Sequence, residues 1–173
     1  MAFAIRATQR VLRRVASKAA TDVAPPTTAL GDWYVNLLHV GKTQLVLCTS
    51  DRSLLSVVLP ARRLKMELHP RLCGAVGELL SHLKVPNNQI TRELAEMETA
   101  TLTRTASRSV LGSMNDFAIL IDAAFRVRPP SSFGALSVEL AGVPCGPLRP
   151  GQDLGFPDRV ARRLLGAVDS AAG

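Results

Sequence analysis

A two-residue turn at Gly41-Lys42, set between two apolar runs, constrains the fold of this chain more than any other feature. The turn is preceded by WYVNLLHV and followed by TQLVLCTS. Both runs are rich in residues that favour strands, and glycine at the first position of a two-residue loop is typical of a β-hairpin. A second turn at Asp51-Arg52 leads into LLSVVLP. The sequence therefore predicts an antiparallel meander over 33–59.

Apolar residues occupy both alternating positions of these runs, which indicates that both faces of the sheet are covered. The alternative for the first run is a helix over 32–38, with Asp32 as its N-cap. Trp33 and Tyr34 are two of seven aromatic residues in the chain. Such a pair either stacks against a base or a partner side chain, or covers the edge of a core. Asn36 needs hydrogen-bond partners if it is buried.

The N-terminal segment predicts a strand followed by a basic helix. Phe3 and Ile5 alternate with Ala4 and Arg6, and Thr8 then has the position of an N-cap for a helix over 9–18. The outer side of this helix carries Arg10, Arg13, Arg14 and Lys18. An arginine-rich start without acidic residues also describes a mitochondrial transit peptide, which is the alternative for this segment.

Beyond the meander the apolar residues recur at the helical period. Pro70 favours the first turn of a helix over 70–83. A second helix is expected over 89–97, with Glu93 in or near the solvent. Alternating β-branched residues predict strands over 100–105 and, further along, apolar alternation predicts one over 136–140.

The stretch TRTASRSVLGSMNDFAILIDAAF, residues 103–125, is the most unusual in composition. Ser113 and Asp116 have the spacing of a capping box ahead of a helix over 113–125. Arg104 and Arg108 lie just upstream among hydroxyl side chains, and two guanidiniums near a helix N-terminus favour an anion. The alternative is structural, with Arg108 paired to an acid and the hydroxyls acting as caps. The candidate ligand- or anion-binding residues are Arg104, Arg108, Ser113, Asn115, Asn36, Trp33 and Tyr34, and Asp116 is the candidate catalytic base.

The segment RSVLGSMND, together with the LGDWYVNLL block, resembles an uncharacterised bacterial family that is described only as a domain of unknown function. The resemblance extends from FAIRATQRVL to the PCGPL segment. It implies a single bacterial domain, and it assigns no activity, ligand or catalytic residue.

The change from period two to period 3.6 along the chain predicts one α+β domain over 1–173, with an antiparallel sheet packed against about four helices. A terminal helix is expected to begin at Pro157. A loop is expected at 19–31, irregular structure at 141–156 and a frayed tail at 169–173. No apolar run reaches the roughly 18 residues of a membrane helix, so no membrane partner is expected.

The formal charge of +7 is concentrated in the first third of the chain, where residues 1–66 hold ten Lys or Arg against three Asp. Such a field favours nucleic acid or an acidic protein as partner, although basic charge also serves plain solubility. Three scattered cysteines, Cys48, Cys73 and Cys145, indicate free thiols in a reducing cytoplasm.

The sequence contains no phosphate-binding glycine loop, dinucleotide fingerprint, nucleophile elbow or zinc cysteine pairs. His69 and Cys73 are four residues apart, a spacing that metals use, but no second pair accompanies them. We therefore expect no metal and no cofactor. The principal hypothesis is a small basic binding module for nucleic acid or an acidic protein. The alternative is a phosphate- or phosphodiester-directed enzyme centred on residues 104–116. The sequence does not indicate an oligomeric state.

Overall fold

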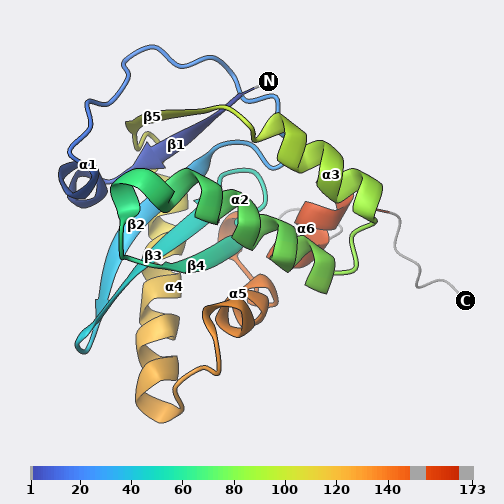
Figure 1. The fold of residues 1–173 in the computed structure, drawn as a ribbon. Coiled ribbons are helices and arrows are strands. Elements are labelled where there is room, and N and C mark those ends of the chain that lie inside the picture. Colours follow the sequence, from blue (N-terminus) through green and yellow to red (C-terminus); the bar gives the residue numbers. More distant parts are fainter. Residues whose placement is uncertain (1, 149–154, 168–173) are drawn as a thin grey trace, which may run out of the picture.

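A computed structural model describes residues 2–148 and 155–167 of the chain. Its centre is a five-stranded sheet with the strand order β4-β3-β2-β1-β5 (Figure 1). The strands are β1 (Phe3–Ala7), β2 (Trp33–Val40), β3 (Thr43–Ser50), β4 (Ser56–Pro60) and β5 (Ala100–Arg104).

The predicted meander is confirmed as β2, β3 and β4, which pair antiparallel. Val40 faces Thr43 across the turn, so Gly41 and Lys42 form the two-residue loop. Gly41 has φ +59°, a conformation that glycine adopts without steric cost. The alternative helix over 32–38 is wrong, because these residues enter β2.

The sheet is mixed, and the prediction of a purely antiparallel sheet is wrong. β1 lies between β2 and β5 and is parallel to both. The two helices that precede β5 carry the chain back to β1, as parallel neighbours require. β1, the segment weighed as a transit peptide, is thus an interior strand of the sheet.

Six α-helices occur in the described part of the chain, where about four were expected. They are α1 (Gln9–Val15), α2 (Leu64–His82), α3 (Asn87–Glu96), α4 (Arg108–Val127), α5 (Phe133–Ala141) and α6 (Pro157–Leu164), with a 3-10 turn η1 at Gly146–Leu148. Among the described residues, no helix combines the length and the apolar character needed to cross a bilayer.

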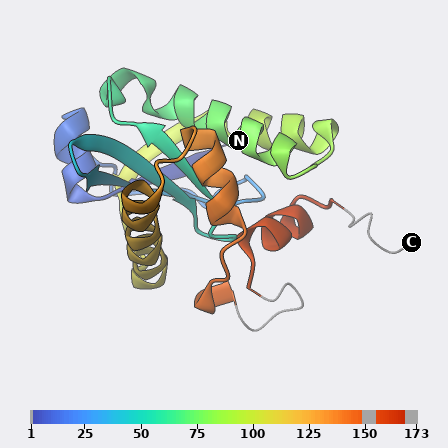
Figure 2. The same cartoon turned by 90° about the horizontal axis from the view of Figure 1, so that it is seen from below.

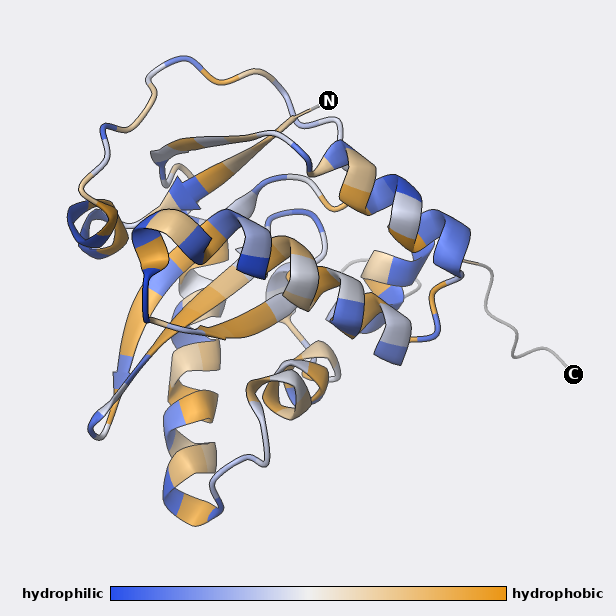
Figure 3. Cartoon of the chain, viewed as in Figure 1, coloured by the Kyte–Doolittle hydropathy of each residue, from blue (hydrophilic) through white to orange (hydrophobic). Residues whose placement is uncertain are grey.

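Helices cover the two faces of the sheet and bury a separate apolar cluster on each. The first cluster joins α1 and α2 to side chains such as Phe3, Trp33 and Val35. The second joins α4 and α5 to Tyr34 and Leu47. Figure 2 shows α2 and α4 on opposite sides of the strands, and Figure 3 shows how far apolar residues dominate the central strands. Trp33 packs in the first cluster and Tyr34 in the second. Successive side chains of a strand point to opposite faces, which explains why apolar residues occupy both alternating sets of positions in β2.

α2 begins at Leu64, nearly two turns before the predicted start, and Pro70 lies inside it. Its buried stripe starts with Leu64 and Leu68 and continues through Leu72 without a break. Pro70 cannot donate a hydrogen bond to the carbonyl of Met66. Met66 is 85% exposed, so water can satisfy that carbonyl. The proline is tolerated because it lies on the solvent side.

Residues 136–140 are part of α5, and the strand predicted there is wrong. The N-cap Ser132 accepts a hydrogen bond from the N–H of Ala135 at 3.0 Å. Leu136 and Leu140 are buried at helical spacing, while Val138 is partly exposed. Apolar alternation over only five residues does not distinguish the period of a strand from that of a helix. The N-cap at Ser132 was the feature that identified a helix here.

The remaining boundaries are close to expectation. α1 ends at Val15 rather than at 18, α3 begins at Asn87, two residues before the predicted start, and β5 lies within the predicted range. Residues 19–31 form the expected loop, with one bridge from Ala20 to Thr103. The expected irregular structure at 141–156 includes η1, while its residues 149–154 and the tail at 169–173 lie outside the described residues.

Candidate functional site

The carboxyl ends of β1 and β5 form a topological switch point. The two strands are parallel neighbours, and their last residues, Ala7 and Arg104, are paired in register. The helix that follows β1 packs in the first cluster, and the helix that follows β5 packs in the second. α1 and α4 therefore leave the sheet on opposite faces. In open sheets with parallel strands, ligands bind at this kind of switch point.

The start of α4 is held beside this switch point by Tyr34 and Ser107. Ser107 is the N-cap, and its hydroxyl accepts from the N–H of Val110 at 3.3 Å. The backbone N–H of Ser107 donates to the Tyr34 hydroxyl at 3.1 Å. The N–H groups of Arg108 and Ser109 have no partner among the described residues. Free N–H groups at the positive end of a helix dipole favour an anion.

Six cations lie on the segments that leave this switch point. Three project from α1, Lys18 lies three residues beyond it, one ends β5 and one begins α4, and Figure 1 shows these elements meeting at one side of the sheet. We call this surface the basic edge: Arg10, Arg13, Arg14, Lys18, Arg104 and Arg108. All six side chains are exposed, and none is paired with an acid in the part of the chain that the structure describes.

Three sequence candidates on β2 have structural roles. Trp33 is fully buried and Tyr34 nearly so, which excludes both rings from stacking on a ligand. Asn36 is partly buried, and its side-chain oxygen accepts from the Thr8 hydroxyl at 3.0 Å and from the N–H of Leu37 at 2.9 Å. Thr8 stands at the N-cap position of α1 but makes no side-chain cap bond. Its hydroxyl links α1 to β2 instead.

The predicted capping box of Ser113 and Asp116 is wrong, because α4 begins at Arg108. Ser113 is buried in the second turn of the helix, whereas Asn115 and Asp116 are exposed. Within the described residues, neither Asn115 nor Asp116 makes a hydrogen bond or ion pair with Arg108 or Asn36. The structural alternative, in which Arg108 pairs with an acid, is therefore not seen among the described residues.

Sequence reasoning missed a buried ion pair at the amino end of β2. Asp32 is 2% exposed, and it accepts hydrogen bonds from the N–H of Ala4 at 2.8 Å and from Nε of Arg6 at 2.7 Å. The N–H of Asp32 donates to Asp51 at 3.0 Å. Gly31 has φ +80°, and a Cβ there would collide with the Asp51 carboxylate. The available signal was a lone acid directly before a buried strand in a basic segment.

Glu93 was expected in or near the solvent and is instead 3% exposed. Its carboxylate accepts the N–H groups of Ala29 and Leu30 at 2.8 and 2.9 Å. Burial raises the pKa of Glu93, and the two hydrogen bonds oppose that rise. Burial also raises the pKa of Asp51, and the charge of Asp32 adds to it. These carboxylates hold the 28–32 segment in place before β2.

The three cysteines are free thiols. Burial raises the pKa of Cys48, and burial together with the charge of Asp116 raises the pKa of Cys145 to about 11. His69 and Cys73 both contact the carbonyl of Met97. Over residues 2–148 and 155–167, no three His, Cys, Asp or Glu side chains cluster as metal ligands would.

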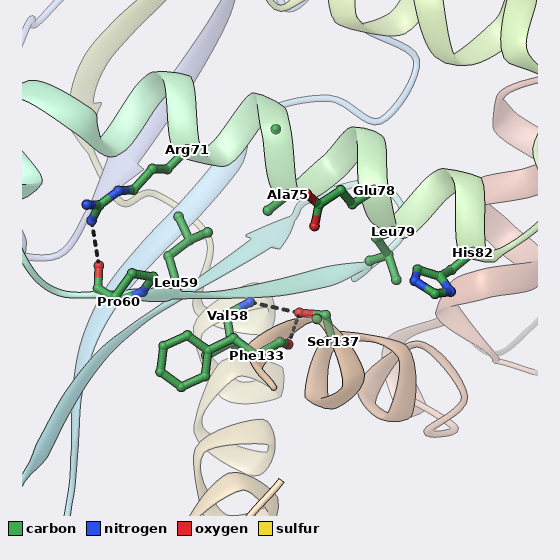
Figure 4. Close-up of a pocket in the computed structure, with 12 residues that line it drawn as sticks. Val58, Leu59, Pro60, Arg71, Ala75, Glu78, Leu79, His82, Phe133 and Ser137 are labelled. Carbon is green, nitrogen blue, oxygen red and sulfur yellow. Dashed lines mark hydrogen bonds between the residues drawn. The ribbon is translucent and has the colours of Figure 1, made fainter. Parts of the chain in front are cut away.

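A cleft of about 390 Å³ lies between α2, β4 and α5 (Figure 4). The Ser137 hydroxyl on its wall accepts from the N–H of Val58 at 3.0 Å and donates to the carbonyl of Phe133 at 2.9 Å. Arg71 donates to the carbonyl of Pro60 at 3.3 Å. These polar groups hold α5 and α2 against the edge strand β4.

Glu78 and His82 line the same cleft one helical turn apart, and both are exposed. A base is useful to catalysis when it reaches a nucleophile that has a proton to give up. The hydroxyl of Ser137 already has a donor and an acceptor in the protein. The cleft is therefore a packing groove and carries no argument for a reaction.

Comparison with known proteins agrees with the resemblance seen in the RSVLGSMND segment. A family model described as a domain of unknown function, DUF6933, matches residues 4–160. No curated protein and no solved structure matches the chain. The matched residues run from β1 to α6 and include the whole basic edge. The chain therefore belongs to the DUF6933 family.

Proposed function

We propose that this protein is a non-catalytic module that binds nucleic acid through the phosphate backbone, with the basic edge as its contact surface. The observation that carries the proposal is the outer side of α1. Arg10, Arg13 and Arg14 are exposed there, Lys18 is exposed three residues beyond the helix, and no acidic residue interrupts the four. A row of unpaired cations attracts a polyanion and releases its counterions on binding.

The start of α4 supplies a second element of the same kind. Arg104 and Arg108 are exposed and free of acidic partners, and the N–H groups of the first turn point away from the helix. Guanidinium groups bind phosphate through two parallel hydrogen bonds, and helix N-termini favour phosphate as well. The switch point thus lies between two elements suited to bind phosphate.

The buried positions of Trp33 and Tyr34 favour duplex or backbone recognition over the stacking of unpaired bases. Phosphate contacts position a protein on nucleic acid but carry no sequence information. We therefore expect weak preference among base sequences. Free cysteines and a basic surface fit a reducing compartment that contains nucleic acid, which for a bacterial protein is the cytoplasm.

The geometry gives less support to a phosphate-directed enzyme. A general base must come within hydrogen-bond reach of the group it deprotonates. Asp116 lies eight residues after Arg108 on one helix, which is about 12 Å along the helix axis at 1.5 Å per residue. The free N–H groups that begin α4 and the candidate base are thus well separated along the helix, which favours binding over catalysis.

The test compares two triple variants that both lower the net charge from +7 to +4. One carries Arg10→Gln, Arg13→Gln and Arg14→Gln, and the control carries Arg62→Gln, Arg92→Gln and Arg128→Gln. The control residues are also exposed but lie outside the basic edge. Fluorescence anisotropy with a labelled duplex and a labelled single strand gives the affinity at several salt concentrations.

We expect the α1 variant to bind more weakly and to lose about 3 units from the slope of log affinity against log salt, since each phosphate contact contributes about 0.9. The control variant should keep most of the wild-type slope. Equal losses in the two variants would show that net charge alone acts. Absence of binding by the wild-type protein at low salt rejects the proposal, and cleavage of the labelled strand revives the enzymatic alternative.

A further inference from the structure

The C-terminal half of α4 leaves the body of the protein. Ile121 is the last buried residue of the helix, although the helix continues to Val127. Figures 1 and 2 show this half extending beyond the strands in both views. On its inner side Ala124 and Phe125 still pack against the second cluster. A helix normally gains stability by packing an apolar face, and here the outer side of this half is left uncovered.

The outward side of this half is apolar where solvent-facing helices are usually charged. Ile119, Ala123 and Val127 are spaced four residues apart and therefore lie on one face. Ile119 is 67% exposed and Val127 is 87% exposed. Contiguous exposed apolar side chains with a charged border are typical of interaction surfaces.

Opposite charges border this apolar face. Asp116 is exposed and has no hydrogen-bond or ion-pair partner among the described residues. Arg126 uses its Nε to bind Asp122 at 2.8 Å, which leaves the two terminal nitrogens of the guanidinium for another acceptor. One end of the face therefore offers an unpaired carboxylate and the other end offers unsatisfied donors.

We propose that this face binds the same face of a second copy of the chain, with the two α4 helices antiparallel. The spacing carries the inference. Asp116 precedes Ile119 by three residues, and Arg126 follows Ala123 by three residues. A two-fold axis at the level of Ile121 then places Ile119 against Ala123 of the second copy and Asp116 against its Arg126. Each contact occurs twice, as an isologous interface requires.

The pairing also fits in shape. The small side chain of Ala123 leaves room for the larger Ile119, so the helices can approach closely at the centre of the face. The contact between one pair of helices is at the small end of specific interfaces, and we expect a dissociation constant on the order of micromolar to tens of micromolar. The charge of +7 on each copy opposes association at low salt. Self-association should therefore be measured at about 0.15 M salt, where the Debye length is about 8 Å and this repulsion is largely screened.

The experiment is sedimentation velocity from about 1 µM to about 500 µM, a range that brackets the expected affinity. Asp116→Arg places two arginine pairs across the axis, and Arg126→Asp places two aspartate pairs there. Each single variant should weaken self-association at least about tenfold, because like charges directly opposed are destabilising. An equimolar mixture of the two variants should recover dimers, since both ion pairs re-form in the heterodimer.

Two further variants complete the test. Asp116→Arg combined with Arg126→Asp in one chain should also restore the dimer. Arg92→Asp, which changes the net charge as Arg126→Asp does but lies on α3, should leave association unchanged. Circular dichroism of each variant separates lost association from lost folding. A wild-type protein that stays monomeric over the whole range overturns the proposal, and so does a mixture that associates no better than either variant alone.

Discussion

The hydroxyl oxygen of Tyr34 accepts a hydrogen bond from the backbone N–H of Ser107, 73 residues further along the chain, at 3.1 Å. This bond ties the middle of the sheet to the first turn of α4, and with it to Arg108 on the basic edge. The two residues belong to segments that the sequence marks as unusual, but no local pattern relates one to the other.

Tyr34→Phe removes this acceptor and leaves the rest of the ring in place. We expect a loss of about 1 kcal/mol in the free energy of unfolding, the usual value for one hydrogen bond between neutral groups. Urea denaturation measures it. Because the bond also positions the start of α4, amide hydrogen exchange at residues 107–111 should accelerate more than exchange in β3. Uniform acceleration across both would contradict a positioning role.

Asp32→Asn should be more damaging, because Asp32 is buried and bonds both the N–H of Ala4 and the guanidinium of Arg6. An amide has one acceptor oxygen, so one of the two donors faces an N–H₂ group instead. Removing one partner of a buried ion pair costs up to 3–5 kcal/mol, and partial exposure of Arg6 reduces this to about 2–3 kcal/mol. Asp22→Asn, at an exposed position, is the control and should be nearly neutral.

Glu93→Ala leaves the N–H groups of Ala29 and Leu30 without acceptors, and we expect a cost of about 2–4 kcal/mol. Glu98→Ala, at an exposed position just beyond α3, should be within about 0.5 kcal/mol of wild type. Chemical denaturation of both variants beside the wild type checks the pair. Equal stability of the two variants would contradict a structural role for Glu93.

The effect of Glu93 on stability should also depend on pH. Burial raises its folded-state pKa, so the folded protein keeps a proton that the unfolded chain has released. The stabilising contribution of Glu93 is therefore fully present below its pKa in the unfolded chain, about 4.3, and it declines as pH rises through its pKa in the folded protein. The difference in unfolding free energy between wild type and Glu93→Ala should be larger at low pH than at neutral pH. If this difference in unfolding free energy instead grew as pH rises, the prediction would be contradicted.

Arg108→Ala separates binding from folding. The side chain is exposed and has no partner among the described residues, so we expect the free energy of unfolding to change by no more than about 0.5 kcal/mol. Nucleic-acid binding, measured by anisotropy, should weaken because one phosphate contact is lost. A large loss of stability with unchanged binding would identify Arg108 as a structural residue instead.

The alkylation rate of the Cys145 thiol should depend on the charge of Asp116. Burial and the charge of Asp116 raise the pKa of Cys145 to about 11, so iodoacetamide should alkylate it slowly at about pH 8 in the native protein. Asp116→Asn removes the second cause, lowers the pKa of the thiol and should speed alkylation. Cys73 serves as the internal control, because burial rather than Asp116 raises its pKa. Mass spectrometry of the labelled peptides resolves the two rates.

Local features of the sequence were sufficient for the hairpin and for several helices. Gly41 specifies the turn through its own backbone preference, and the two runs beside it carry enough strand-forming residues to pair across it. The spacing of Met114, Phe117 and Ile121 likewise identified the buried side of α4. In each case the decisive interactions lie within a few residues of one another in the chain.

Boundaries depended on what the flanking residues meet in space. Ser107 and Ser113 are both suitable N-caps, and α4 begins at the earlier one because Val110 packs into the second cluster. The same holds for α2, whose stripe begins at Leu64 because that residue reaches the first cluster. Propensity cannot choose between two acceptable caps when burial favours one of them.

The position of β1 and the grouping of the basic edge were decided by the tertiary structure alone. Ala7 and Arg104 are 97 residues apart in number and adjacent in the sheet. Their pairing depends on the two helices that return the chain to β1, and no periodicity within either strand encodes that neighbour. The sequence by itself determined the meander, most of the helices and the basic character of the first third. Long-range pairing brought Arg104 and Arg108 to the same end of the sheet as α1 and buried Asp32 and Glu93, because contacts between distant segments depend on which surfaces remain to be covered after local structure has formed.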